Sequence, residues 1–260
     1  MELDDRPDLA QRLKDAIPAA TLIAMRPSAS GGPDEILVVE RSSRLAFAGG
    51  MIAFPGGRVE AADGVLAQRL APGLPPAEAS ARVAALRETF EETGLLCGLR
   101  GNADFSELEQ ARAELLAGAD FAALLADRGW ALDPAALMPF ARWCPPAEIV
   151  LARRFDARFY LVRAPAGAPV SPDRTENAAS FWASAGALIE DAEGGRLKIL
   201  GPTRATLMRL AMGRGFADAR ASAREFPVRE ILPVVRSEGG ERWAGVPAGH
   251  GYPDVDFRLR

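Results

Sequence analysis

Apolar residues cluster near the start of the chain in a pattern that predicts adjacent β-strands. Two short runs, "ATLIAMRP" and "EILVVERSS", are rich in Ile, Leu and Val, and the turn-forming "SASGGPDE" lies between them. Runs of this kind, bounded by Gly, Pro and Ser, are typical of strands joined in a hairpin. A third apolar segment, "GGMIAFPGG", predicts a strand that enters a tight turn at Gly56 and Gly57.

The apolar spacing then becomes helical. Pro72, Pro75 and Pro76 break any continuous helix. Beyond Pro76, residues on one helical face are apolar or small, namely Ala79, Val83, Leu86, Phe90 and Leu95. Gly94 is well placed to end this helix, because glycine readily adopts the left-handed conformation that follows a last helical turn. We therefore predict a helix from about residue 76 that stops at Gly94.

The remaining pattern mixes helices and strands. Residues 106–140 are rich in Ala, Leu and Glu and predict two short helices, broken near Gly118 and Gly129. Strands are predicted in "FARWCPP", "RRFDARFYLVRAP" and "FWAS", and helices in "SAGALIEDAEGG" and "GPTRATLMRLAMG". From Phe226 onward we expect irregular structure or edge strand. No repeat or dividing linker is visible, so we expect a single domain over residues 1–260.

Composition narrows the function classes. The 260 residues are 48% hydrophobic, enough for a sizeable core, and the net charge of −4 lacks the basic field that nucleic-acid binding usually needs. Cys97 and Cys144 are too few for a disulfide framework or a tetrahedral thiolate site. The N-terminus lacks signal-peptide features and no apolar run approaches bilayer length. We expect a cytoplasmic protein with a small-molecule substrate, no nucleic-acid partner and no membrane partner.

The segment "ALRETFEETGLL" contains the candidate chemistry. On a helix, Glu88, Glu91 and Glu92 would share one face, with neighbouring Cβ atoms roughly 5–6 Å apart. Like charges at this spacing repel, so either a solvated face with neighbouring arginines or a bound hard cation must offset the repulsion. Ions such as Mg²⁺ take carboxylate and carbonyl oxygens, and the Gly-Gly segment preceded by "FP" could bring backbone carbonyls close.

The same residues resemble the signature of Nudix hydrolases, which is a glycine, five residues, an acid, a spacer, and then Arg-Glu-x-x-Glu-Glu-x-Gly and an aliphatic residue. The glycine is Gly57 and the first acid would be Asp63, in place of the usual glutamate. The second half is complete and comprises Arg87, Glu88, Glu91, Glu92, Gly94 and Leu95. The spacer is far longer than usual, and Thr89 replaces an aliphatic residue. The resemblance implies an α/β/α sandwich with a mixed sheet, with helical insertions at about 64–84 and 102–139.

The resemblance also implies a mechanism. In Nudix enzymes the helix glutamates hold Mg²⁺ or Mn²⁺ on the diphosphate of a nucleoside diphosphate linked to another group, and a water attacks phosphorus. Metal ligands here would be Glu88, Glu91 and Glu92, with the carbonyl oxygen of Gly57. Arg87 would hold a carboxylate in place by a charge-assisted hydrogen bond. Glu176, before "FW", would be a further metal ligand, the general base or a solvated loop acid.

Beyond the signature, most of the chain resembles the subgroup that includes the mammalian peroxisomal coenzyme A diphosphatase. An upstream pattern of that subgroup, Arg-(Ser/Ala)-x-x-x-Arg-x-x-x-Gly-x-x-x-Phe-Pro-Gly-Gly, begins at Arg41 and ends at Gly57. Ala46 stands where its second arginine belongs, and Arg44 lies two residues earlier. Candidate substrate-binding residues are Arg41 and Arg44, together with Arg153 and Arg154, which could bind phosphate or pair with acids such as Asp156.

The leading expectation is therefore a metal-dependent Nudix diphosphatase acting on coenzyme A or acyl-coenzyme A. A broader nucleotide-sugar or dinucleotide diphosphatase is the second possibility. A Nudix-fold sensor that binds a nucleotide without cleaving it is the third. The insertion at 102–139 could form part of a homodimer interface or a lid over an acyl chain, and its amphipathic pattern permits both.

Overall fold

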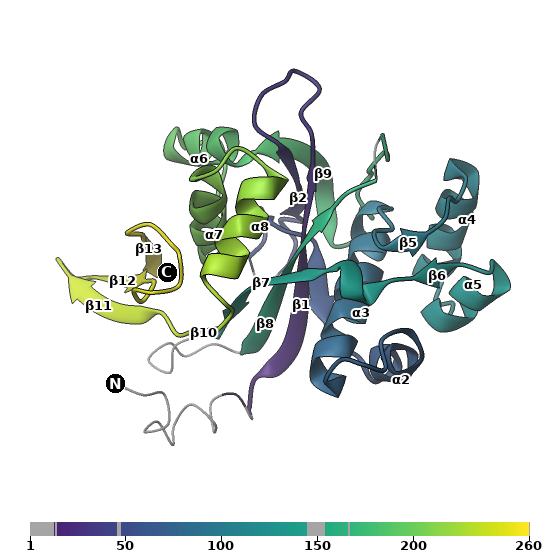
Figure 1. The fold of residues 1–260 in the computed structure, drawn as a ribbon. Coiled ribbons are helices and arrows are strands. Elements are labelled where there is room, and N and C mark those ends of the chain that lie inside the picture. Colours follow the sequence, from purple (N-terminus) through teal and green to yellow (C-terminus); the bar gives the residue numbers. More distant parts are fainter. Residues whose placement is uncertain (1–12, 14, 46–47, 145–153, 166, 260) are drawn as a thin grey trace.

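A mixed β-sheet lies at the centre of the molecule, with helices on both faces (Figure 1). The computed structural model describes residues 13, 15–45, 48–144, 154–165 and 167–259. Within these residues eight strands form the sheet in the order β10-β7-β8-β1-β2-β3, with β4 paired to β1 and β9 paired to β2. The strands are β1 (Ile17–Arg26), β2 (Glu35–Arg41), β3 (Ile52–Ala53), β4 (Gly56–Arg58), β7 (Met138–Trp143), β8 (Phe155–Arg163), β9 (Asn177–Ser184) and β10 (Glu230–Ile231).

The central strand β1 changes its antiparallel partner along its length. Near the hairpin, Met25 pairs with Ile36 of β2, which confirms the predicted hairpin. Further back, Ala20 pairs with Gly57 of β4. On its other side β1 is parallel to β8 from Ile17 to Met25. The antiparallel edge of β1 is thus divided between β2 and β4.

The prediction of a tight turn at Gly56 and Gly57 is wrong, because both residues belong to strand β4. Gly56 has a φ of 151°, and a Cβ atom on it would lie only 2.3 Å from the carbonyl oxygen of Ala20. A side chain cannot fit there, so glycine allows the two strands to approach. Glycine is therefore needed at Gly56 for the close approach of two strands and not for a turn.

Helices cover the two faces of the sheet. One face carries α2 (Ala61–Leu70), α3 (Pro76–Thr93), α4 (Phe105–Leu116) and α5 (Phe121–Asp127), and the other carries α6 (Ala185–Glu193), α7 (Gly201–Ala211) and α8 (Phe216–Glu225). The predicted helix at residue 76 is confirmed, since α3 begins at Pro76 and Gly94 ends it with a φ of 76°. Among the helices in the described part of the chain, none is long and apolar enough to cross a membrane.

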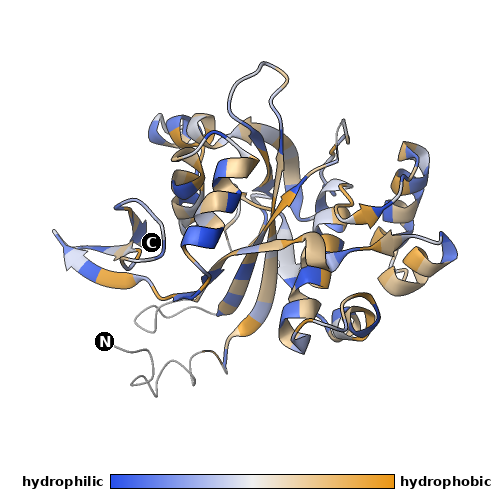
Figure 2. Ribbon diagram, in the orientation of Figure 1, coloured by the Kyte–Doolittle hydropathy of each residue, from blue (hydrophilic) through white to orange (hydrophobic). Residues whose placement is uncertain are grey.

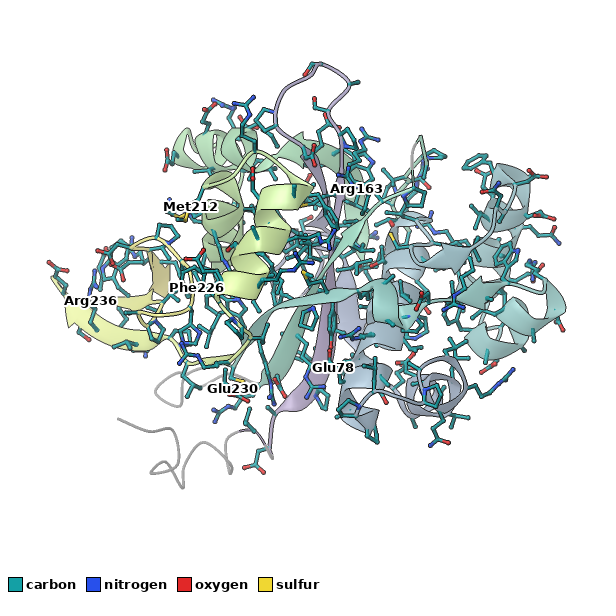
Figure 3. The ribbon with its side chains drawn as sticks, in the orientation of Figure 1. Glu78, Arg163, Met212, Phe226, Glu230 and Arg236 are labelled. Carbon is teal, nitrogen blue, oxygen red and sulfur yellow. The ribbon has the colours of Figure 1, made fainter. Side chains whose placement is uncertain are left out.

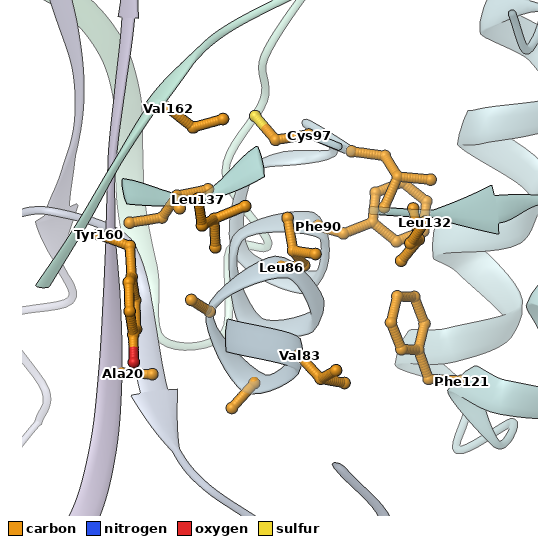
Figure 4. Close-up of a cluster of buried hydrophobic side chains, with 14 of the residues drawn as sticks. Ala20, Val83, Leu86, Phe90, Cys97, Phe121, Leu132, Leu137, Tyr160 and Val162 are labelled. Atoms are coloured by element: carbon orange, nitrogen blue, oxygen red, sulfur yellow. The ribbon is translucent and has the colours of Figure 1, made fainter. Parts of the chain in front are cut away.

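Alternating side chains of the central strands build two separate cores. Leu22 of β1 and Tyr160 of β8 point to the α3 side, whereas Ile23 and Leu161 point to the α7 side. The first core is centred on α3, where Leu86 and the other buried side chains pack between the sheet and α5 (Figure 4). Colouring by hydropathy shows apolar central strands and helices with mixed surfaces (Figure 2). This is the three-layer α/β/α sandwich that the resemblance implied.

Contacts between charged and aromatic side chains join the outer elements to the sheet. Arg163, labelled in Figure 3, ends β8. Its guanidinium carbon lies 4.9 Å from the ring centroid of Phe216 in α8. Glu230 of β10 accepts a hydrogen bond from Arg142 of β7. The first contact joins α8 to β8, and the second joins β10 to β7.

Parts of the chain depart from the expected elements. Helix α8 was not predicted, because its buried side is formed mainly by the small residues Ala219 and Ala223. Beyond Phe226 the chain forms a separate three-stranded sheet in the described residues, comprising β11 (Val234–Glu238), β12 (Glu241–Gly245) and β13 (Asp256–Leu259). The two helices predicted around Gly118 are confirmed as α4 and α5, and a small two-stranded sheet, β5 (Leu99–Arg100) and β6 (Ala131–Leu132), pairs the chain before them with the chain after them.

Candidate active site

Two of the three helix glutamates lie directly against strand β4. Glu92 is buried, and its Oε2 accepts a hydrogen bond of 2.9 Å from the backbone N–H of Gly56. Glu88 lies beside the next residue, because a Cβ atom added to Gly57 would be 2.4 Å from the carboxyl carbon of Glu88. The last two turns of α3 therefore place two carboxylates on the backbone of the Gly56–Gly57 segment.

Arg87 joins the third glutamate to this group. Its Nη1 donates to Oε1 of Glu88 at 3.0 Å and to Oε1 of Glu91 at 3.2 Å. The other side of the guanidinium donates twice to the buried Asp63, from Nε at 2.8 Å and from Nη2 at 3.0 Å. Arg87 thus contacts carboxylates on both sides, and Asp63 acts as the counter-charge that holds it.

Burial raises the pKa of each helix glutamate above its ordinary value. Burial raises the pKa of Glu88 to about 7, although the charge of Arg87 and its hydrogen bond oppose this. It raises the pKa of Glu92 to about 8 against hydrogen bonds from the Gly56 backbone and from Asn177. The pKa of Glu91 is also raised by burial, against Arg87. The protein therefore holds carboxyl groups that its own positive charges do not fully compensate.

The donor atoms of these residues suit a hard divalent cation, whereas the arrangement of the described side chains matches a metal site only in part. Within the described residues, no group of three or more His, Cys, Asp or Glu side chains is arranged to hold a metal ion. Glu91 is turned to Arg87, whereas Glu88 and Glu92 lie beside the Gly57 and Gly56 backbone. Carboxylate and carbonyl oxygens are the donors that Mg²⁺ and Mn²⁺ prefer, and a cation would offset the desolvation of both carboxylates. The donor chemistry therefore fits such an ion.

The structure adds Asn177, a residue that was not selected from the sequence. Asn177 is fully buried at the start of β9, and its side chain hydrogen-bonds Glu92. Its Nδ2 also donates to Oδ2 of Asp173 at 2.7 Å. In the sequence, the one feature that points to Asn177 is its position directly after Glu176. Glu176 itself is exposed, and its backbone carbonyl accepts a hydrogen bond of 2.7 Å from the backbone N–H of Ser42.

The structure describes three of the four candidate substrate-binding arginines, and they lie on different segments of the chain. Arg41 is the last residue of β2, and its positive charge lowers the pKa of Glu92. The Nε atom of Arg41 is buried and has no hydrogen-bond partner among the described residues. Arg44 is exposed, with Nε 3.5 Å from Oγ of Ser42. Arg154 lies beside the first residue of β1, where its carbonyl accepts from Ile17 N. Arg153, like Ala46, lies outside the described residues.

Gly57→Ala is expected to retain the fold and lose activity. The backbone of Gly57 is not in the left-handed region, and the atoms that a new methyl group would meet are the carboxyl atoms of Glu88, at 2.4–2.5 Å. A flexible side chain can move away, so the free energy of unfolding should change by less than about 1.5 kcal/mol, while Glu88 is displaced. Thermal unfolding and turnover assays check both parts. Unchanged turnover would mean that the position of Glu88 on Gly57 is not needed.

Comparison with known proteins gives a consistent result. A family model described as NUDIX domain matches residues 17–164. Two curated relatives are named acyl-coenzyme A diphosphatase NUDT19. The Gallus gallus protein is 30% identical over 274 aligned positions, covering 85% of this chain and 70% of its own. The Xenopus laevis protein is 26% identical and covers 82% of this chain and 67% of its own. A crystal structure of a NUDIX hydrolase from Alicyclobacillus acidocaldarius is 30% identical with a TM-score of 0.70, covering 80% of this chain and 96% of that one.

Proposed function

Because this chain belongs to the Nudix family and is a Nudix hydrolase, we propose that it cleaves the diphosphate of coenzyme A or acyl-coenzyme A with Mg²⁺ or Mn²⁺. The observation that carries the proposed reaction is the placement of the buried Glu88 and Glu92 against the Gly56–Gly57 backbone. The choice of substrate is supported by the two relatives, whose similarity extends beyond the matched domain over more than four fifths of the chain.

In the proposed site, Glu88, Glu91 and Glu92 would hold the ion together with the carbonyl oxygen of Gly57. When bound, such an ion neutralises phosphate charge and lowers the pKa of a water molecule. Arg87 keeps the carboxylates of Glu88 and Glu91 in place through Nη1, and Asp63 anchors Arg87 from behind.

Two further groups complete the proposed chemistry. Arg41 ends β2 with its charge near Glu92, and its guanidinium would bind a phosphate oxygen of the substrate. Glu176 accepts a proton from the attacking water through its carboxylate. The water oxygen forms a bond to phosphorus as the bridging P–O bond breaks, which gives a phosphopantetheine and adenosine 3′,5′-bisphosphate.

One observation favours a second substrate class. Ala46 occupies the position of the second arginine in the upstream pattern of coenzyme A diphosphatases. Without that guanidinium the chain has one fewer group to bind a phosphate of the substrate, and this weakens the preference for coenzyme A. A nucleotide-sugar or dinucleotide diphosphatase is therefore the alternative.

A substrate panel distinguishes these possibilities. Coenzyme A, an acyl-coenzyme A, ADP-ribose, NADH and ATP are each incubated with the protein and Mg²⁺ or Mn²⁺, with EDTA as the control. We expect the highest kcat/KM on coenzyme A or its acyl derivative, no turnover with EDTA, and products that identify cleavage within the diphosphate. Preference for ADP-ribose or NADH would support the alternative, and turnover of ATP alone would exclude both diphosphate classes.

A further inference from the structure

The last turn of α3 leaves three carbonyl groups that the helix cannot satisfy itself. Gly94 turns the chain away after donating to the carbonyl of Phe90. The carbonyls of Glu91, Glu92 and Thr93 therefore need donors from elsewhere in the protein. Buried carbonyls without partners are costly, so these donors determine whether the end of the helix is held in place.

All three donors come from segments distant in the sequence. The backbone N–H of Ser171 donates to the Thr93 carbonyl at 3.0 Å, and that of Asp173 donates to the Glu92 carbonyl at 3.1 Å. Arg112, in helix α4 of the insertion, donates from Nε to the Glu91 carbonyl at 2.9 Å. Two metal-ligand candidates are thus held through their backbone by parts of the chain outside the family signature.

Arg112 also connects these segments to each other. Its Nη1 donates to Oγ of Ser171 at 2.8 Å, so one guanidinium spans the end of α3 and the start of the loop over residues 171–177. That loop carries Glu176 and Asn177, and Asp173 organises it by accepting hydrogen bonds from the N–H groups of residues 175, 176 and 177.

The burial of Arg112 is unusual for a residue with only a structural role. The residue is 8% exposed, and its guanidinium donates to a carbonyl and to a hydroxyl group and forms no ion pair with a carboxylate among the described residues. Burying a cation without a paired carboxylate carries a desolvation penalty, and an apolar side chain of similar volume would avoid it. The arginine is therefore better explained by the hydrogen bonds that it makes. Its charge lies close enough to Asp173 and Glu92 to act on both.

We propose that Arg112 is a positioning residue for the catalytic site, through which the insertion at 102–139 fixes the backbone of Glu91 and the loop that carries Glu176 and Asn177. The catalytic consequence rests on the proposed function, whereas the structural link does not. The insertion is therefore required for the site to keep its shape.

Amide hydrogen exchange on the metal-free protein tests the link without any substrate. Arg112→Met removes both donors, and Arg112→Lys keeps the charge without the planar fork. The matched control is Arg128→Met, because Arg128 lies in the same insertion but donates to Glu114 of α4 and does not bond to α3. We expect exchange at the amides of Ser171 and Asp173 to rise about tenfold or more in Arg112→Met, less in Arg112→Lys, and less than about twofold in the control.

Equal exchange at these amides in the wild type and in Arg112→Met would overturn the proposal. So would equal loss of protection in Arg128→Met, because the effect would then be a general loosening of the insertion. If Arg112→Met does not fold, Ser171→Ala removes one end of the bridge at an exposed residue, and raised exchange at Asp173 is still expected.

Steady-state kinetics then test the consequence for turnover. We expect kcat of Arg112→Met to fall by about 10–100-fold, which is typical when a group that orients metal ligands is lost, with KM changed less than about threefold. Arg112→Lys should recover part of kcat. A raised KM with unchanged kcat would exclude a positioning role. If the wild type turns over no diphosphate in the panel while the exchange result holds, the proposed function fails and the link between insertion and loop stands.

Discussion

Glu92→Gln is expected to lower kcat at least about a hundredfold without destabilising the fold. Metal-based stabilisation of phosphate charge is worth several kcal/mol, and about 1.4 kcal/mol corresponds to a tenfold rate change. The amide oxygen of Gln can still accept from Gly56 N, while the desolvation cost of the buried carboxylate disappears. We therefore expect an unchanged or higher free energy of unfolding in the absence of metal.

Three measurements check this expectation. Turnover is measured with saturating Mg²⁺, unfolding with urea in EDTA, and the affinity for Mn²⁺ by calorimetry. Glu109→Gln is the matched control, because Glu109 is exposed on α4 and its change should alter none of the three. A stable Glu92→Gln protein with wild-type kcat and Mn²⁺ affinity would remove Glu92 from the proposed site. Loss of activity together with unfolding would show that the carboxylate is a structural group.

Arg87→Met is expected to lower the free energy of unfolding by about 3–5 kcal/mol, because it leaves a buried carboxylate without its counter-charge. Asp63 is 2% exposed and receives two hydrogen bonds from Arg87, while Glu88 and Glu91 lose a donor as well. Urea unfolding in EDTA measures the change. Arg100→Met provides the control, because Arg100 and Asp133 form a much more exposed pair and its loss should cost at most about 1 kcal/mol.

A double-mutant cycle separates the pair from its surroundings. Asp63→Asn removes the buried charge that Arg87 compensates, so Arg87→Met should cost less in that background by about 1–3 kcal/mol. Equal costs in the two backgrounds would show that Asp63 and Arg87 are not coupled. The Arg87→Met protein is also expected to lose turnover, because the carboxylates of Glu88 and Glu91 lose the hydrogen bonds from Nη1 that orient them.

Local patterns were sufficient for much of the fold. The helix that begins at Pro76 and stops at Gly94 was predictable because proline, apolar spacing and glycine are all local signals. The hairpin between β1 and β2 was predictable for the same reason. Helix α8 was not, because its buried residues, Ala219 and Ala223, are alanines, and alanine is too weakly apolar to mark a buried face in the sequence. The role of Gly56 was also missed, since the need for glycine arises from Ala20 on another strand.

The candidate site also contains some residues that local spacing identifies and others whose contacts depend on tertiary packing. Glu88, Glu91 and Glu92 could be selected because helical spacing gathers them within two turns. Asp63 reaches Arg87 from another helix, Asn177 reaches Glu92 from β9, and these contacts depend on how the layers pack. Arg112 belongs to no motif, because one of its partners is a backbone carbonyl, which every residue has, and the other is the hydroxyl of Ser171, which is distant in the sequence.

The pairing of β1 with β8 has a consequence for synthesis of the chain. Ile17 pairs with Phe155, so the innermost strand is made early and its parallel neighbour more than a hundred residues later. At ribosomal rates of about 5–20 residues per second, β8 is synthesised on the order of ten seconds after β1. Until then the apolar side chains of β1 and the edge that pairs with β8 are not covered. During that interval the nascent polypeptide would be a natural client for a chaperone, and slower codons between the two strands would lengthen its exposure.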